Sequence, residues 1–290
     1  MATTLAQLRS SVYNYLPDTA TSNVYTTSLV DQLINDVQVE ICDSWKWQFL
    51  QKMYSTGATA DTALDGDITT ADTTIDLDST DGMPTSGAIR VDHDIIPYTG
   101  ITGDTLTGVT GIMTDHTSGA VVAPLITMPT DYGDLMELLI QTEGDSTPRK
   151  YTYVNQFDFD QSRQCDVYTI VQDNDGTQYI QIRNTITTNI VIFHYLKTPT
   201  TMSADGDFAT IPTPYALKVI PKIVAGKAMV GFGDDINGIG TTLLGMGERE
   251  LFAMQKQYGE KEQGYKQNIK SNYGMRTRPY SRNFYNARNA

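Results

Sequence analysis

The 290-residue sequence contains few of the residues from which most metal and redox sites are built. Its two cysteines, Cys42 and Cys165, are too few and too far apart for a disulfide framework. Its three histidines, His93, His116 and His194, do not stand near either cysteine at the spacing of zinc ligands. We therefore expect no metal site, no cofactor and a reducing compartment such as the cytoplasm.

Long hydrophobic runs are missing as well. No apolar stretch approaches the roughly 18 residues that a membrane-spanning helix needs. Residues 1–16, MATTLAQLRSSVYNYL, show neither a basic leader nor an apolar block with a cleavage site. We expect a chain that is made in the cytoplasm, is not exported and has no membrane partner.

The sequence motifs of common enzyme classes are also absent. The chain has no G-x-S-x-G and no Walker loop, and GFGDDI at residues 231–236 lacks the third glycine of a dinucleotide site. DGD at residues 65–67 and DNDG at residues 173–176 begin like calcium loops, but neither reaches a glutamate at the twelfth position. We interpret both as solvated turns. Carboxylate pairs for glycoside hydrolysis are not excluded, but no spacing selects one. We expect no enzymatic activity.

Positive charge is scarce, and much of it lies at the C-terminal end. The net charge is −13, yet six basic residues and no acid follow Glu262, whereas the residues before them carry −19. Residues 61–123 hold eleven Asp against Arg90 alone. The last stretch, MRTRPYSRNFYNARNA, combines arginine with aromatic residues, the types that anchor protein interfaces. It predicts an extended arm, residues 271–290, that orders on a partner.

Helical patterns stand at both ends of the chain. Thr4 and Gln7 have the spacing of a capping box, and a second helix is predicted to start near Thr26. The apolar stripe expected along these two helices is Leu5, Leu8, Val12, Leu29, Leu33, Val37 and Ile41, with Trp45 and Trp47 as core anchors. Near the other end, Pro214 suits the first turn of a helix that Pro221 should kink, and a last helix is predicted from about Thr242.

The residues between these helices favour strands. Residues 61–123 contain short alternating runs separated by Asp-Gly, Ser-Gly and Thr-Gly turns, a pattern typical of a small all-β module. The run IVIFHY at residues 190–195 is apolar on both faces except at His194, which predicts a buried central strand. DNDGTQ supplies a hairpin turn between YTIVQ and YIQIR.

These patterns predict an α+β protein in four parts. N- and C-terminal helices form a bundle, and an antiparallel β core lies between them. Residues 1–60 and 124–270 form the core of the protein, residues 61–123 are an inserted all-β module, and residues 271–290 are the arm.

Several stretches also have a familiar order along the chain. TTLAQLRSSVYNYLPD and VYTTSLVDQLINDVQVEICDSWKWQFL suggest a helix pair that ends in tryptophan, with QKMYST as the strand after it. MPTDYGDLMELLIQ, PRKYTYVNQFDFDQS and VIFHYLKTPTTMSADGDFATIPTPYALKVIPKIVAGKA follow, with a Tyr-x-x-x-Pro, an acidic DGDF and an IPTPY before a helix. In this order they resemble the head-to-tail adaptor, or connector, proteins of tailed bacteriophages. The resemblance covers most of residues 1–55 and 125–227.

The resemblance implies a virion structural protein at the head-to-tail junction. It implies a ring of identical subunits, usually a dodecamer, beneath the portal protein and above a tail protein of the nozzle or stopper type, with DNA passing through without specific binding. In that family the C-terminal segment inserts into the portal. The predicted contact set here is Arg276, Arg278, Tyr280, Arg282, Phe284, Tyr285 and Arg288. Because acidic walls repel phosphates, the charge of −9 on residues 1–60 and 124–262 predicts an acidic lumen.

A second resemblance concerns the inserted module. STDGMPTSGAIRV, DIIPYTGITGDTLTGVTG and HTSGAVV are similar to a small β module of phage structural proteins, although Gly111 stands where arginine is common there. Alternative functions therefore stay open. The module could bind a fibre, a decoration protein or a glycan on the outer surface of a virion, or the basic tail could bind nucleic acid. An unrecognised hydrolase is the third alternative.

Overall fold

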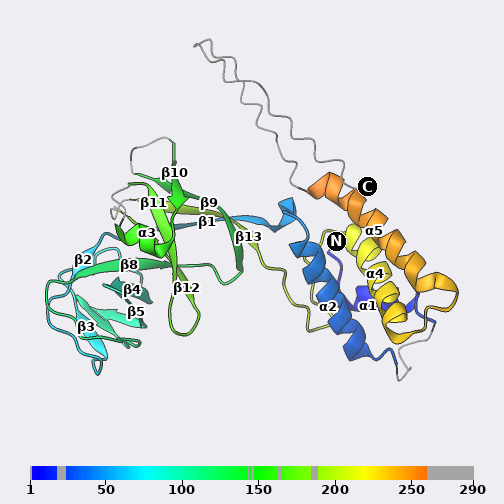
Figure 1. Ribbon diagram of the computed structural model, residues 1–290, viewed down its shortest axis with the longest axis horizontal. Helices are drawn as coiled ribbons and strands as arrows, with labels where there is room; N and C mark the ends of the chain where they lie inside the picture. The colour runs from blue at the N-terminus through cyan, green and yellow to red at the C-terminus, as the bar shows by residue number, and fades with distance from the viewer. Residues whose placement is uncertain are drawn as a thin grey trace, which may run out of the picture. The chain divides into compact units, whose positions relative to one another are not determined.

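The protein combines five α-helices with a large curled β-sheet in the part of the chain that a computed structural model describes (Figure 1). The described residues are 2–17, 24–142, 144, 147–161, 165–183 and 189–259. The predicted α+β class is confirmed at this level. Among these residues, every helix is too short or too polar to cross a membrane.

The first two helices begin where the capping patterns predict. Helix α1 spans Leu5–Tyr13. The Thr4 hydroxyl accepts a hydrogen bond from the backbone N–H of Gln7, whose side chain accepts one from the backbone N–H of Thr4. Helix α2 spans Thr27–Asp43, and the hydroxyl of Thr26 accepts from the N–H of Leu29. Both caps satisfy donors that the first helical turn leaves unpaired.

The end of α2 corrects one expectation. Trp47 is an anchor, as predicted, since its side chain is buried and its Nε1 donates to the carbonyl of Ile41 at 2.6 Å. Trp45 is 43% exposed and is not a core anchor. The reason is that α2 ends at Asp43, so the four-residue spacing no longer places the next residues on the buried face. The short helix η1, Gln48–Leu50, leads into the first strand.

The last two helices are separated by a glycine-containing turn. Helix α4 spans Tyr215–Phe232 directly after Pro214 and is continuous through Pro221. It ends at Gly233, whose positive φ closes the helix. The short helix η2, Ile236–Gly238, precedes helix α5, Ile239–Tyr258, which starts three residues before the predicted Thr242.

Helix α4 is the centre of the helical core. Helices α1, α2 and α5 all pack against it, and Figure 1 shows it between α2 and α5. Its closest approach to α5 depends on glycine. A Cβ atom on Gly226 would lie 2.7 Å from Leu244 Cγ and 2.8 Å from the carbonyl oxygen of Gly240. A Cβ on Gly247 of α5 would lie 2.5 Å from Ile223 Cγ1.

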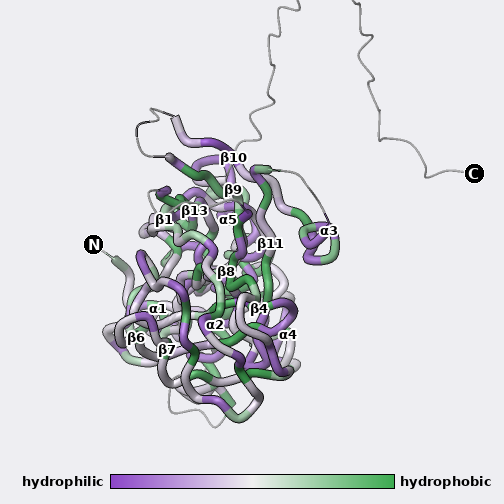
Figure 2. The backbone as a smooth tube through the Cα atoms, turned by 90° about the vertical axis from the view of Figure 1, so that its left-hand side faces the viewer, coloured by the Kyte–Doolittle hydropathy of each residue, from purple (hydrophilic) through white to green (hydrophobic). Residues whose placement is uncertain are grey.

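The strands form one large and one small sheet. In the large sheet the order is β1 (Gln51–Gly57), β13 (Ile190–Lys197), β9 (Tyr132–Gln141), β10 (Arg149–Tyr153), β11 (Val167–Gln172), β12 (Gln178–Ile182), β8 (Val121–Thr127), β4 (Gly87–Val91) and β5 (Asp94–Tyr98). Strand β2 (Thr62–Ala63) pairs with β8, and β3 (Thr74–Asp76), β7 (Thr105–Thr107) and β6 (Gly100–Thr102) form the small sheet. Figure 2 shows hydrophobic residues where β4 and β8 run.

Strand β13 is central but is buried on one face only. It pairs with β1 on one side and β9 on the other, as predicted. Val191, Phe193 and Tyr195 are fully buried, whereas Ile190 is 46% exposed and His194 is half-buried. The expectation of two fully buried faces is wrong, because the residues that alternate with the buried ones are only half-buried or exposed.

The β core departs from an antiparallel arrangement at one pair. Strands β10 and β11 run parallel, whereas all other described pairs are antiparallel. Parallel neighbours need a crossover connection, and here it contains helix α3, Gln156–Gln161, which the sequence patterns missed. Asn155 starts α3 by accepting from the N–H of Asp158 at 2.8 Å. Figure 2 shows the mixed hydrophilic and hydrophobic residues of this short helix.

The DNDG turn and strand β8 complete the sheet. The predicted hairpin is confirmed: β11 and β12 pair across it, and Gly176 has a φ of 88°. The proposed module boundary at residues 123 and 124 lies inside β8. Its first part pairs with β2 and β4, and its last residues, Ile126 and Thr127, pair with β12.

The contact between α4 and α5 predicts an unusual response to alanine. Alanine favours helices over glycine by about 1 kcal/mol, yet Gly226→Ala should lower the free energy of unfolding by roughly 1–3 kcal/mol because its methyl group meets Leu244 and Gly240. Gly231→Ala is the matched control on the same helix, since a Cβ there meets nothing within 4 Å. Urea unfolding measures both. Equal stabilisation by the two substitutions would contradict the close approach.

Candidate functional site

The predicted arm residues lie outside the part of the chain that the structure describes. This applies to all seven: Arg276, Arg278, Tyr280, Arg282, Phe284, Tyr285 and Arg288. The structure instead shows three polar features that connect distant segments, and one groove.

The first feature is the strap, residues 198–213, which runs from β13 to α4 across the N-terminal helices. Asn35 of α2 donates to the carbonyl of Met202 at 3.0 Å and accepts from its N–H at 2.9 Å. Gln38, almost fully buried, donates to the carbonyl of Thr200 and accepts from the N–H of Thr210. Each amide uses a donor and an acceptor on the strap's backbone, so these two side chains of α2 hold the strap at Thr200, Met202 and Thr210.

The strap also contacts α1. The backbone N–H groups of Leu5 and Ala6, which have no partner inside the helix, donate to the carbonyls of Asp207 and Asp205. Arg9 makes a bidentate ion pair with Asp31 at 2.7 Å and reaches Asp205 at 2.9 Å. The acidic DGDF stretch therefore caps the start of α1.

The second feature is the buried Arg90 of β4. Its NH1 and NH2 atoms donate to the two carboxylate oxygens of Asp160 in α3 at 2.8 Å, and NH1 also reaches Gln181 Oε1 of β12 at 2.8 Å. Its Nε donates to the carbonyl of Asp92. The single basic residue of segment 61–123 thus joins this segment to two elements outside it. In the sequence, Arg90 stands out only as the single basic residue of this segment.

The third feature is a pair of carboxylates around His116. Its Nδ1 lies 3.0 Å from Asp92 Oδ2 and its Nε2 lies 3.1 Å from Asp94 Oδ2. Burial alone would raise the pKa of Asp94, but hydrogen bonds from the backbone of Thr114 and Met113 and from the side chains of His116 and Thr114 outweigh it and lower that pKa. Asp94 holds the loop after Gly111, because it accepts from the backbone N–H groups of Met113 and Thr114, and both Asp94 and His116 are buried.

Other candidate chemistry has little support in the described residues. No cluster of His, Cys, Asp and Glu among them is arranged to hold a metal ion. Burial raises the pKa of Cys42 to about 12, so its thiol stays protonated at neutral pH. In the DNDG turn the Asp173 carboxylate accepts hydrogen bonds from the N–H groups of Asp175 and Thr177 and from the Tyr179 hydroxyl, so it stabilises the turn itself.

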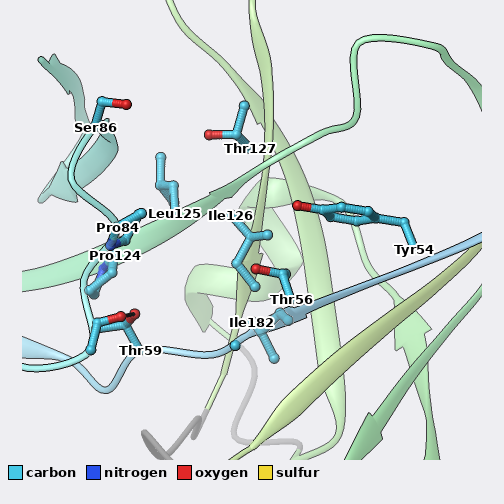
Figure 3. A pocket seen from close by; sticks show the side chains of 12 residues that line it. Tyr54, Thr56, Thr59, Pro84, Ser86, Pro124, Leu125, Ile126, Thr127 and Ile182 are labelled. Carbon is cyan, nitrogen blue, oxygen red and sulfur yellow. Dashed lines mark hydrogen bonds between the residues drawn. The ribbon is translucent and has the colours of Figure 1, made fainter.

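The groove has a volume of about 400 Å³ and opens where β1, the loop before β4, β8 and the end of β12 meet (Figure 3). Its walls combine hydroxyl groups with proline and aliphatic side chains, and no charged side chain of the described residues lines it. The hydroxyls of Tyr54, Thr56, Ser86 and Thr127 have no hydrogen-bond partner among the described residues. Such a lining can take a small, uncharged ligand with both polar and apolar faces. No sequence pattern predicts this groove, because its residues come from four distant segments.

Arg90 predicts a test of how strongly segment 61–123 is joined to its neighbours. Arg90→Met leaves Asp160 and Gln181 without their shared donor, so the free energy of unfolding should fall by roughly 2–4 kcal/mol. The control is Lys52→Met, which removes a surface ion pair with Asp131 and should lower the free energy of unfolding far less, because solvent screens that pair. Chemical denaturation measures both, and equal losses would show that Arg90 does not join the segments.

Comparisons with known proteins do not identify a family. No protein-family model matches the chain, and a search of curated proteins finds no match to its sequence.

Proposed function

We propose that the protein is a virion structural protein, a head-to-tail adaptor of a tailed bacteriophage. It forms a dodecameric ring at the head-to-tail junction, docks beneath the portal protein through its C-terminal arm and holds a tail protein of the nozzle or stopper type below. DNA passes through its lumen without specific binding, and the protein catalyses no reaction.

One observation carries this proposal: the segments that resemble adaptors at opposite ends of the chain hydrogen-bond to one another. Thr3 and Thr213 join their hydroxyls at 2.6 Å, and Asn35 and Gln38 hold the strap. The DGDF and IPTPY stretches of the resemblance therefore meet its opening helix pair. These stretches are far apart in the sequence, and their direct contact supports the view that they belong to one structural unit.

The finer architecture belongs to the same proposal. Helices α1, α2, α4 and α5 form the bundle, residues 61–123 are an inserted module, and residues 271–290 are the arm. Arg90 then fixes the orientation of the module, because it bonds to α3 and β12 of the surrounding core.

The charge distribution supports the two proposed roles of the chain. Basic and aromatic side chains in the arm suit an acidic groove on a partner, and many copies in a ring multiply a weak single contact. The acidic residues elsewhere repel phosphates, so DNA would pass without being retained.

Removal of the arm tests the proposal. A chain that ends at Gly274 should keep its circular dichroism spectrum and melting temperature but should no longer load onto the portal ring of the same phage, as measured by native mass spectrometry. The control variant Lys266→Gln with Lys270→Gln leaves the predicted contact set intact and should still load in about twelve copies. Unchanged loading of the truncated chain would contradict the role of the arm.

A second candidate function is favoured by the groove. An outer-surface virion protein would bind a fibre, a decoration protein or a glycan where Gly82, Pro84 and Ser86 of the inserted module meet the groove residues of β1, β8 and β12. The unpartnered hydroxyls beside apolar walls suit a neutral sugar, because sugars combine hydroxyl groups with apolar C–H faces.

Sugar binding is testable with the intact chain. Saturation-transfer NMR with millimolar D-glucose and N-acetylglucosamine should show contact in the wild type. Thr56→Val with Thr127→Val should abolish it, because the change removes two hydroxyls at nearly constant volume. Thr74→Val, an exposed position on β3 outside the groove, should leave binding unchanged. A wild-type chain that binds neither sugar would remove this candidate.

A further inference from the structure

Helices α2 and α5 lie on two sides of α4 and run in the same direction. Before α2, Tyr25 donates to Asp234 Oδ2 at 2.8 Å, and its ring meets Phe232 at 5.9 Å, close to where α5 begins. After α2, Trp47 forms a β-bridge with Gly259, directly after α5 ends. A residue just before α2 therefore contacts residues that precede α5, and a residue after α2 pairs with the residue directly after α5. The two helices run in the same direction.

The outer face of α2 is acidic. Asp36 and Asp43 are exposed, seven residues apart, and make no hydrogen bond or ion pair with any described residue. Seven residues are nearly two helical turns, so the two carboxylates lie on one stripe about 10 Å apart. Val39, which is 42% exposed, lies between them.

The outer face of α5 carries two cations at the same spacing, with the exposed Glu248 beside the first of them. Arg249 and Lys256 are exposed and seven residues apart, and neither pairs with a carboxylate of the described chain. Arg249 donates only to the carbonyl of Gly245 in its own helix, and Lys256 lies over the ring of Phe252 at 4.6 Å. Phe252 is 57% exposed and Met246 is 40% exposed, so apolar surface accompanies these cations.

We propose that these two faces meet between neighbouring copies of the chain, with α2 of one copy against α5 of the next. This inference rests on the proposed ring. Copies related by a small rotation about a ring axis keep the two helices nearly parallel, which sets Asp36 opposite Arg249 and Asp43 opposite Lys256. Val39 then lies against the apolar surface around Phe252.

The contact is heterologous, because each copy presents a different face on each side. Heterologous contacts generate closed rings when the rotation closes. A second copy is the occupant that the charges favour, since both faces carry the matched spacing within a single sequence. Nucleic acid is disfavoured on the α2 face, where the free charges are negative.

Charge reversal tests the contact from both sides. Asp36→Lys with Asp43→Lys, and separately Arg249→Glu with Lys256→Glu, should each weaken self-association at least tenfold, because two attractive pairs become repulsive. The variant with all four substitutions should recover association, since every contact again joins opposite charges. Asp65→Lys with Asp78→Lys, on the exposed surface of segment 61–123, is the control for net charge and should leave association unchanged. Native mass spectrometry and sedimentation velocity measure the full-length chain, alone and with the portal ring.

The outcomes separate this inference from the proposed function. Rings that form equally well with either double variant would overturn the α2–α5 contact and leave the adaptor proposal standing. Rings that require the contact but ignore the portal would support the inference and contradict the adaptor. A wild-type chain that stays monomeric under both conditions would overturn the inference. Loss of portal loading without loss of self-association would assign the faces to another partner and overturn it as well.

Discussion

The burial of α4 is the constraint on which the rest of the structure depends. Ten of its residues are buried, spread around most of its circumference, so the helix needs neighbours on several sides. Those neighbours come from the first 43 residues and from α5. The intervening strands must therefore leave the helices and return to them. The antiparallel pair of β1 and β13 does this, because one strand departs directly after α2 and η1 and the other returns to the strap.

Buried polar side chains fix how segments that pack through hydrophobic contacts are oriented relative to one another. A buried amide or guanidinium without partners costs free energy, so such groups persist where their donors and acceptors are used. Gln38 meets the strap's backbone at both ends of its amide, and Arg90 meets a carboxylate, an amide and a carbonyl. These contacts orient the strap and segment 61–123 in a way that apolar packing, which has no direction, does not.

Because Arg90 is buried, its positive charge does not offset the negative charge on the surface of segment 61–123. Segment 61–123 has eleven Asp and one basic residue, and that residue is buried. The surface of this segment is therefore acidic with no compensating cation of its own. Free cations among the helices, such as Arg249 and Lys256, are separated from it in sequence and lie on α5. Charge is thus segregated on the surface as well as along the chain.

The sequence by itself determined the features that depend on a few neighbouring residues: the caps at Thr4 and Thr26 and the Asp-Gly hairpin. Caps and turns follow from hydrogen bonds and backbone angles within one turn of chain. Only the tertiary structure decided which face of β13 is buried, which tryptophan is an anchor and what Arg90 binds. Its side-chain partners are 70 and 91 residues away, and the groove draws on four segments. Local patterns carry no information about such distant neighbours, because these depend on how every element packs.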